Sequence, residues 1–114
     1  MKKIGIVLVT VMILGLGLFS GCTTQTQKKA PVATCSANPT NGTAPLIVYF
    51  YGSGNESGGM IISYHWDFDD GTGSYLQNPT HTFTTLGTFI VRFTVTDNNM
   101  TTGTSTIPIT VRAS

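Results

Sequence analysis

Charged side chains are scarce in this chain of 114 residues. Only 10% of the residues are charged, six Lys and Arg against five Asp and Glu, which gives a formal net charge of +1. Because no basic stripe is present to neutralise a run of phosphates, the composition argues against nucleic acid as a partner. Two cysteines are too few to staple a small domain with disulfides or, without a cluster of His and Cys, to hold a structural zinc ion.

A helical repeat is also lacking. After residue 30, no stretch places its apolar residues at the spacing of an α-helix, and apolar residues recur at every second position instead. Turn-forming clusters of Gly, Pro, Asn and Asp, such as residues 38–42 and 52–59, separate the alternating stretches. The pattern predicts an all-β sandwich or barrel of about seven strands.

The alternation assigns each side chain to a face of its strand. We expect the core to be formed by every second residue of Leu46–Phe50, Ile62–Phe68, Phe89–Val95 and Ile107–Val111. Trp66 lies in the second stretch, where its large indole can be buried between two sheets. Because Pro108 has no N–H for a ladder hydrogen bond, the last strand is expected to lie at a sheet edge there.

The N-terminal segment differs in character from the rest of the chain. Met1-Lys2-Lys3 is followed by 17 uncharged, mostly apolar residues, from Ile4 to Ser20. The stretch Leu18-Phe19-Ser20-Gly21-Cys22 resembles a lipoprotein signal box, although Phe19 stands where Leu is usual. The resemblance implies that residues 1–21 are a signal segment and that the Cys22 thiol receives a lipid. The alternative is an uncleaved N-terminal membrane helix.

Residues 22–30 are predicted to be a flexible tether, because residues 23–30 are polar and have no hydrophobic period. The predicted domain therefore spans residues 31–114. Under either interpretation of the N-terminal segment, we expect the domain on the extracellular face of the cell membrane. The membrane is then a partner, through a lipid anchor or an N-terminal helix.

One motif within the domain points to a family. The stretch Trp66-Asp67-Phe68-Asp69-Asp70-Gly71-Thr72 resembles the Trp-Asp-Phe-Gly-Asp-Gly signature of polycystic-kidney-disease (PKD) domains, and residues 42–46, 78–83 and 87–97 fit the family in order and spacing. The resemblance covers about residues 31–114. It implies an immunoglobulin-like β-sandwich of two sheets that serves as an extracellular, non-catalytic module. The residues that carry the fold signature are Trp66, Asp67, Phe68, Asp70, Gly71 and His81.

The signature also predicts local geometry. Asp69 stands where the family has Gly, and Asp tolerates a left-handed backbone there at some cost. Alternation predicts that Asp67 and Asp69 share the outward face of their strand and that His65 points outward. We expect His81 to point inward with Phe83 and to form a hydrogen bond within the fold, to the Asp-rich turn.

The acidic and histidine side chains suggest two chemistries. Asp67, Asp69, Asp70, His65 and His81 are acid–base residue types, but no nucleophile motif accompanies them and the acids belong to the family signature, so we expect no enzymatic activity. Some PKD domains bind calcium through a loop of roughly Asp-x-Asp-Gly. The matching loop here, residues 56–59, holds only one acid, and Ca²⁺ takes six to eight oxygens. We therefore expect no metal and no cofactor.

Cys35 has no partner in the chain if Cys22 carries a lipid. It shares one face of the first strand with Ala33 and Ala37. We expect a small buried thiol that packs under Trp66. The alternative is a reactive or dimer-forming thiol.

A row of apolar side chains is predicted to face outward. Ile47, Tyr49 and Tyr51 alternate with residues expected in the core. A contiguous exposed apolar row often marks a binding surface, and Tyr is favoured at interfaces. The alternative is that neighbouring strands or the tether cover this row.

Three sequons, which begin at Asn41, Asn55 and Asn99, are possible glycosylation sites and lie in predicted loops.

Two functions fit these features. The leading hypothesis is a non-catalytic cell-surface interaction or adhesion module, anchored to the membrane, that binds a protein or a polysaccharide through a sheet face or loops. The alternative is a purely structural surface-coat or spacer component without a dedicated ligand.

Overall fold

The computed structural model describes residues 29–114, which form eight strands and no helix. The predicted all-β sandwich is confirmed, with eight strands where the sequence indicated about seven, because two of them are very short. The described part of the chain therefore offers no helix able to cross a membrane. The strands are β2 (Val32–Asn38), β3 (Asn41–Thr43), β4 (Leu46–Asn55), β5 (Ile61–Asp67), β6 (Gly73–Ser74), β7 (Thr80–Phe83), β8 (Gly87–Asp97) and β9 (Thr102–Arg112).

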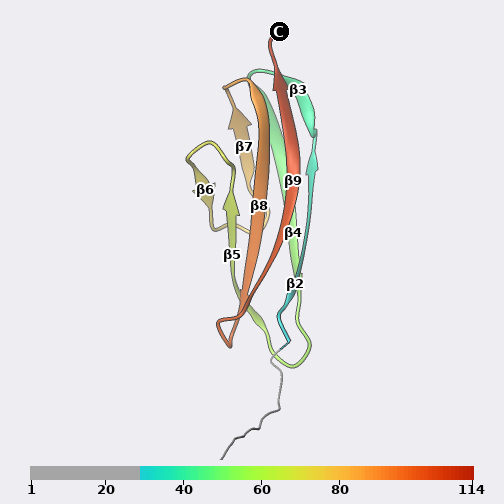
Figure 1. Cartoon of the computed structure of the whole chain (residues 1–114), viewed down its shortest axis with the longest axis vertical. Helices are drawn as coiled ribbons and strands as arrows, with labels where there is room; N and C mark the ends of the chain where they lie inside the picture. The colour runs from blue at the N-terminus through green and yellow to red at the C-terminus, as the bar shows by residue number, and fades with distance from the viewer. Residues whose placement is uncertain (1–28) are drawn as a thin grey trace, which may run out of the picture.

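The strands form two sheets, which face each other as the layers of a sandwich (Figure 1). One sheet has the order β2-β4-β7 and the other has the order β3-β9-β8-β5-β6. All pairs are antiparallel except β3 with β9. The longest ladder joins β8 to β9 and runs from Gly87 opposite Val111 to Thr96 opposite Thr102. This ladder keeps two alternating stretches in one register, so that their apolar faces point the same way.

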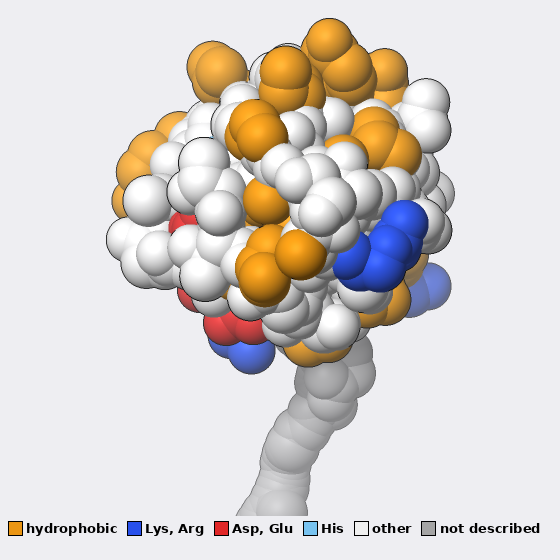
Figure 2. Space-filling model, turned by 90° about the horizontal axis from the view of Figure 1, so that it is seen from above, with side chains coloured by type: hydrophobic (Ala, Val, Ile, Leu, Met, Phe, Trp, Pro, Cys, Tyr) orange, Lys and Arg blue, Asp and Glu red, His pale blue; other side chains and the backbone are white. Residues whose placement is uncertain are grey.

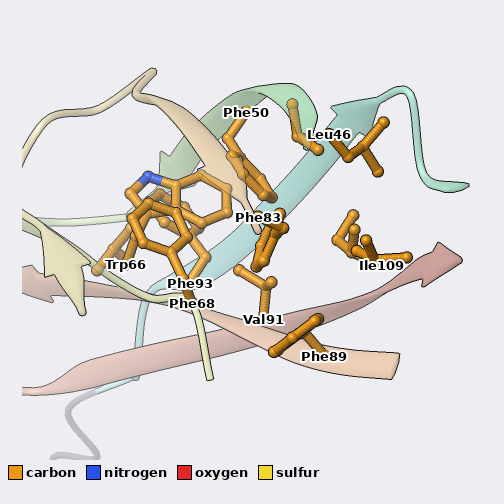
Figure 3. Packing of buried hydrophobic residues seen from close by; sticks show 12 residues of the cluster. Leu46, Phe50, Trp66, Phe68, Phe83, Phe89, Val91, Phe93 and Ile109 are labelled. Carbon is orange, nitrogen blue, oxygen red and sulfur yellow. The ribbon is translucent and has the colours of Figure 1, made fainter. Parts of the chain in front are cut away.

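Aromatic and branched side chains from both sheets fill the space between the layers (Figure 3). Trp66 of β5 is fully buried there, with its ring centroid 4.4 Å from that of Phe93 and 5.0 Å from that of Phe50. Its Nε1–H donates a hydrogen bond to the Gln77 carbonyl oxygen at 3.0 Å, so the polar atom of the indole is satisfied. The buried core residues are Leu46, Val48, Phe50, Trp66, Phe68, Phe83, Phe89, Val91, Phe93, Val95, Ile109 and Val111.

Strand β4 extends further than the sequence indicated. Residues 52–55 were expected to begin a turn, yet they continue β4 opposite β2, from Gly52 paired with Cys35 to Asn55 paired with Val32. Gly52 lies against the ring of Phe93, and a Cβ at this position would lie 2.4 Å from the Phe93 ring. Because Gly52 has no side chain, β4 packs closely on the aromatic ring at this position. A glycine in a strand can therefore mark such a close approach and not a turn.

Strand β5 contains one irregularity that the alternation missed. Ile61 pairs with Asp97 and Ser63 pairs with Thr96, so Ile62 is an extra residue between two ladder positions. Ile62 was expected in the core but is 52% exposed, while Ile61 is half-buried and packs against the core. The expectation for Ile62 was wrong because a bulge shifts the register at the start of the strand.

Strand β9 confirms the expectation for Pro108. On one side Pro108 lies opposite Ile90 of β8, and on the other side β3 pairs only with residues 110–112 of β9. The Thr110 N–H points toward β3 and donates to the Thr40 carbonyl oxygen at 2.9 Å. Because Pro108 precedes Thr110 by two residues, its nitrogen faces the same side, where β9 is an edge.

Candidate functional site

The row formed by Ile47, Tyr49 and Tyr51 lies on the outer face of the three-stranded sheet. These side chains are 51%, 51% and 52% exposed, whereas the alternate residues of β4 from Leu46 to Gly52 are buried. The two neighbouring strands leave the row open, so the sheet does not cover it. The structure thus brings the three predicted residues together on the central strand of a sheet.

Short polar side chains flank this row on both sides. Tyr49 lies between Asn38 of β2 and Thr80 of β7, and Ile47 lies opposite Thr82. None of the exposed side chains that the described strands place on this face is charged. They are Val32, Thr34, Ser36, Asn38, Ile47, Tyr49, Tyr51, Ser53, Asn55, Thr80 and Thr82.

We call these eleven side chains the tyrosine face. Alternate residues of a strand are about 6.6–6.8 Å apart, so the row extends over roughly 13 Å, from Ile47 to Tyr51. Its rings offer apolar area with hydroxyl groups at their tips, and the flanking Ser, Thr and Asn side chains both donate and accept hydrogen bonds. Such a surface suits a neutral ligand that carries many hydroxyl groups. Charged side chains are also few in the view of the domain from its C-terminal end (Figure 2).

The acidic residues of the signature form hydrogen bonds within their own turn and to neighbouring strands. Asp67 Oδ1 accepts a hydrogen bond from the Asp69 N–H at 3.0 Å, and Asp69 Oδ2 accepts one from the Ile90 N–H at 2.9 Å. Asp69 has a φ of 65°, so the left-handed backbone that the family resemblance implied is present. The expectation that Asp67 and Asp69 share one strand face was wrong, because β5 ends at Asp67 and the backbone turns at Asp69.

Asp70 and His81 form a contact between the two sheets. His81 Nε2 lies 2.7 Å from Asp70 Oδ2, and the His81 ring stacks on Phe68 at 4.1 Å with an interplanar angle of 8°. The predicted hydrogen bond from His81 to the Asp-rich turn is therefore present. Burial opposes ionisation of the Asp70 carboxyl, but hydrogen bonds from Thr72 and His81 outweigh it and hold the pKa of Asp70 below its ordinary value. These contacts indicate that the signature residues contribute to the stability of the fold.

His65 points outward, as expected, on the face of β5 opposite to that of the buried Trp66, and it is half-buried because its ring packs on the exposed Tyr75 at a centroid distance of 4.8 Å. Cys35 is also half-buried and packs at the border of the core that contains Trp66. Its Sγ lies 3.4 Å from Ser105 Oγ of β9. Both residues thus have contacts within the fold.

Sequence analysis missed one acidic pair, Glu56 with Asp97. Asp97 is fully buried and accepts hydrogen bonds from the N–H groups of Asn99 and Thr101, both at 2.9 Å. Burial, and after it the charge of Asp97, raises the pKa of Glu56, whose Oε1 is buried without a hydrogen-bond partner. Burial also opposes ionisation of Asp97, but hydrogen bonds from Thr101 and Asn99 hold its pKa below the ordinary value.

The two acids are 41 positions apart in the sequence, and a local motif search cannot join them. Within residues 29–114, no group of three or more His, Cys, Asp or Glu side chains is close enough to hold a metal ion. The expected absence of a metal stays a prediction.

The three sequon asparagines, Asn41, Asn55 and Asn99, are all exposed. Only Asn99 lies in a turn, since Asn41 begins β3 and Asn55 ends β4. The expectation that all three lie in loops was therefore wrong for two of them, because β3 and the end of β4 were not predicted as strands. The signal segment 1–21 and the lipid site Cys22 lie outside the described residues.

Known proteins resemble most of this chain. The family model of the PKD domain matches residues 28–111. Collagenase ColA of Bacillus cereus is 35% identical over 82 residues, which is 71% of this chain but only 8% of that collagenase.

Two solved structures are similar to the whole domain. The PKD1 domain of Epp from Vibrio anguillarum is 31% identical, with a TM-score of 0.65, over 77% of this chain and all of that domain. A structure described as concerning carbohydrate-binding modules of the β-sandwich superfamily is 27% identical, with a TM-score of 0.72, over 78% of this chain and 37% of that one. With its signature Trp66 in the core and a family model that spans most of its length, this chain belongs to the PKD domain family.

Proposed function

We propose that this chain is a cell-surface binding module, anchored to the membrane through its N-terminal segment, that holds a polysaccharide or a protein on the tyrosine face. The PKD domain is a non-catalytic module. The observation that carries the proposal is the exposed, uncharged row of Ile47, Tyr49 and Tyr51.

The chemistry of the face favours a neutral polysaccharide as the ligand. Tyrosine rings stack on the apolar faces of sugar rings, while the Ser, Thr and Asn side chains beside them suit sugar hydroxyl groups. A neutral ligand needs no charged partner, and the tyrosine face offers none. The similarity to a structure concerning carbohydrate-binding modules supports the same choice. The similarity to collagenases keeps a collagen-like protein as the second ligand class to be tested.

A glycan array and a pull-down from envelope extract test the proposal, with a collagen film as a third surface. We expect the wild-type chain to bind neutral glycans and the double variant Tyr49→Ala/Tyr51→Ala to lose at least tenfold in affinity. Tyr75→Ala is the matched control, because Tyr75 is exposed but lies in the connection after β6. If all three proteins bind equally, the tyrosine face is not the binding surface. If no surface retains the wild-type chain, the spacer hypothesis replaces the binding hypothesis.

A further inference from the structure

Exposed apolar side chains also gather at the end of the domain from which the N-terminal segment departs. Met60 precedes β5 and is 62% exposed, and Met100, in the β8–β9 turn, is 74% exposed. Ile62, the extra residue of the β5 bulge, is 52% exposed. The start of β2 lies at this same end, as do the β4–β5 and β8–β9 connections (Figure 1).

Backbone contacts hold these connections side by side. The Asn98 N–H donates to the Met60 carbonyl oxygen at 3.0 Å, and the Met60 N–H donates to Asn98 Oδ1 at 3.2 Å. The turn itself is braced by Asp97, whose carboxylate accepts from the N–H groups of Asn99 and Thr101. The two methionines therefore project from a braced tip.

The backbone conformation of Met100 is strained, and the exposed side chain makes little contact in the fold that compensates for this strain. Met100 has a φ of 63°, in the left-handed region that Gly and Asn adopt with the least strain. A bulky apolar residue in this conformation, mostly exposed to water, contributes little to the fold. A contact of this side chain with a surface outside the domain accounts for the strained conformation.

Lys29 supplies an exposed positive charge at this end. Lys29 is exposed and lies beside Asn55, the last residue of β4, and Ser57 of the β4–β5 connection. Two acids also lie at this end, Asp97, which is fully buried, and Glu56, which is partly buried and whose pKa is raised by burial and by the charge of Asp97. An apolar tip beside a lysine complements a lipid surface with anionic headgroups.

We propose that this tip, made of Met60, Ile62 and Met100 beside Lys29, contacts the headgroup region of the membrane that anchors the chain. The inference rests on the proposed anchoring, because the chain before Lys29 leads to Cys22 and to the uncharged run 4–20. The nine residues 22–30 reach at most roughly 30–32 Å. So short a tether keeps the tip at a high effective concentration at the bilayer, where a weak contact is sufficient.

The contact fixes the orientation of the domain. With the tip at the bilayer, the opposite end, with Leu86 before β8, points away from the membrane, and the tyrosine face runs along the side of the domain. A ligand on that face then lies beside the surface of the cell.

Site-specific labelling of the full chain tests the contact. The chain is purified from membranes and reconstituted in vesicles with anionic lipids, and Cys35→Ser leaves an introduced cysteine as the only free thiol once Cys22 carries its lipid. One label replaces Ser57 near the tip, and the matched label replaces Thr85 near the opposite end. We expect a headgroup-level lipid quencher to quench the label at 57 at least twofold and to leave the label at 85 unchanged. Met60→Ser/Met100→Asn should abolish the difference, and Asn suits the left-handed backbone, so the turn is preserved.

The remaining outcomes separate the two proposals. A chain that stays with the vesicles but shows equal quenching at 57 and 85 overturns the tip contact and leaves the anchoring intact. A chain that does not sediment with the vesicles overturns the anchoring, and the tip contact with it. A signal at 57 that disappears when the protein is diluted in the lipid indicates a second copy of the chain on the tip, which also overturns the inference.

Discussion

His81 of the three-stranded sheet and Asp70, which follows β5 of the five-stranded sheet, lie 2.7 Å apart and join the two layers of the sandwich. The signature acid is thus bound to a residue 11 positions later in the chain. Asp70 therefore helps to hold the two sheets together, and through its carboxylate the free energy of unfolding depends on pH.

We expect the His81–Asp70 contact to weaken in acid. The pKa of Asp70 lies below its ordinary value of 3.8, so the ionised carboxylate stabilises the fold. This contribution is complete above the pKa of the unfolded chain and is lost as the pH falls through the lower pKa of the folded state. His81→Gln should lower the free energy of unfolding by about 1 kcal/mol at pH 7 and by less at a pH below the pKa of Asp70 in the folded state, as urea denaturation would measure. An equal loss at both pH values would contradict this assignment.

Trp66 should dominate the stability of the core. The indole is fully buried and its N–H is satisfied, so Trp66→Ala removes a large packed side chain and should cost about 3–5 kcal/mol. In a domain of this size that loss nearly abolishes folding. Because the chain has one Trp, its fluorescence reports this site alone. Emission typical of a water-exposed indole in the native protein would contradict the packing between the sheets.

Gly52 should not tolerate even a methyl group. A Cβ there would lie 2.4 Å from the ring of Phe93, which is fully buried and cannot move aside. Gly52→Ala should therefore destabilise the domain by about 1–3 kcal/mol, the usual cost of overpacking. Ser53→Ala is the matched control, because Ser53 is the next residue of β4 and is exposed. Thermal unfolding of both variants is the measurement, and equal midpoints would show that the strand can shift.

The pattern of apolar residues was sufficient to predict the layers of this fold. Leu46, Val48 and Phe50 alternate with an exposed row in a strand that has no irregularity at these positions, so a period of two describes it completely. The same rule failed at Ile62, because a bulge adds one residue and no side chain there signals it. It also failed at Gly52, where a turn-forming residue continues a strand to make room for a ring contributed by another strand.

Contacts between residues that are distant in the sequence are the part of the site that could not be predicted. The tyrosine row lies on one strand, so its exposure could be predicted from the sequence. The pair Glu56–Asp97 joins the β4–β5 connection to the last residue of β8, and it follows only from the register of β5 with β8. The short strand β3 was missed for the same reason, since its only ladder partner is β9, far along the chain.

A further prediction concerns the processing and lipidation of the N-terminal segment. If the box from Leu18 to Cys22 is processed, the mature protein begins at a Cys22 that carries a lipid, and it partitions into detergent. Cys22→Ser should remove the lipid from the purified chain, whereas Cys35→Ser should leave it in place. Mass spectrometry of the purified chain is the measurement. An intact Met1 would favour the uncleaved membrane helix over the lipoprotein.

Calcium binding tests whether Glu56 and Asp97 form a metal site. Ca²⁺ takes six to eight oxygens, but only two carboxylates meet at Glu56 and Asp97, and the Asp97 carboxylate already accepts hydrogen bonds from Asn99 and Thr101. We therefore expect 1 mM Ca²⁺ to leave the thermal midpoint nearly where a chelator leaves it.

The measurement can detect a real site easily. A ligand at 100 times its Kd adds about 2.7 kcal/mol to the stability of the native state. In a domain of this size, each kcal/mol raises the midpoint by about 4–8 °C. A rise of that order, abolished by Glu56→Gln but not by Asp67→Asn in the signature turn, would show that the buried, unpartnered oxygen of Glu56 is a calcium ligand. The same rise in both variants would place the ion away from Glu56 and Asp67.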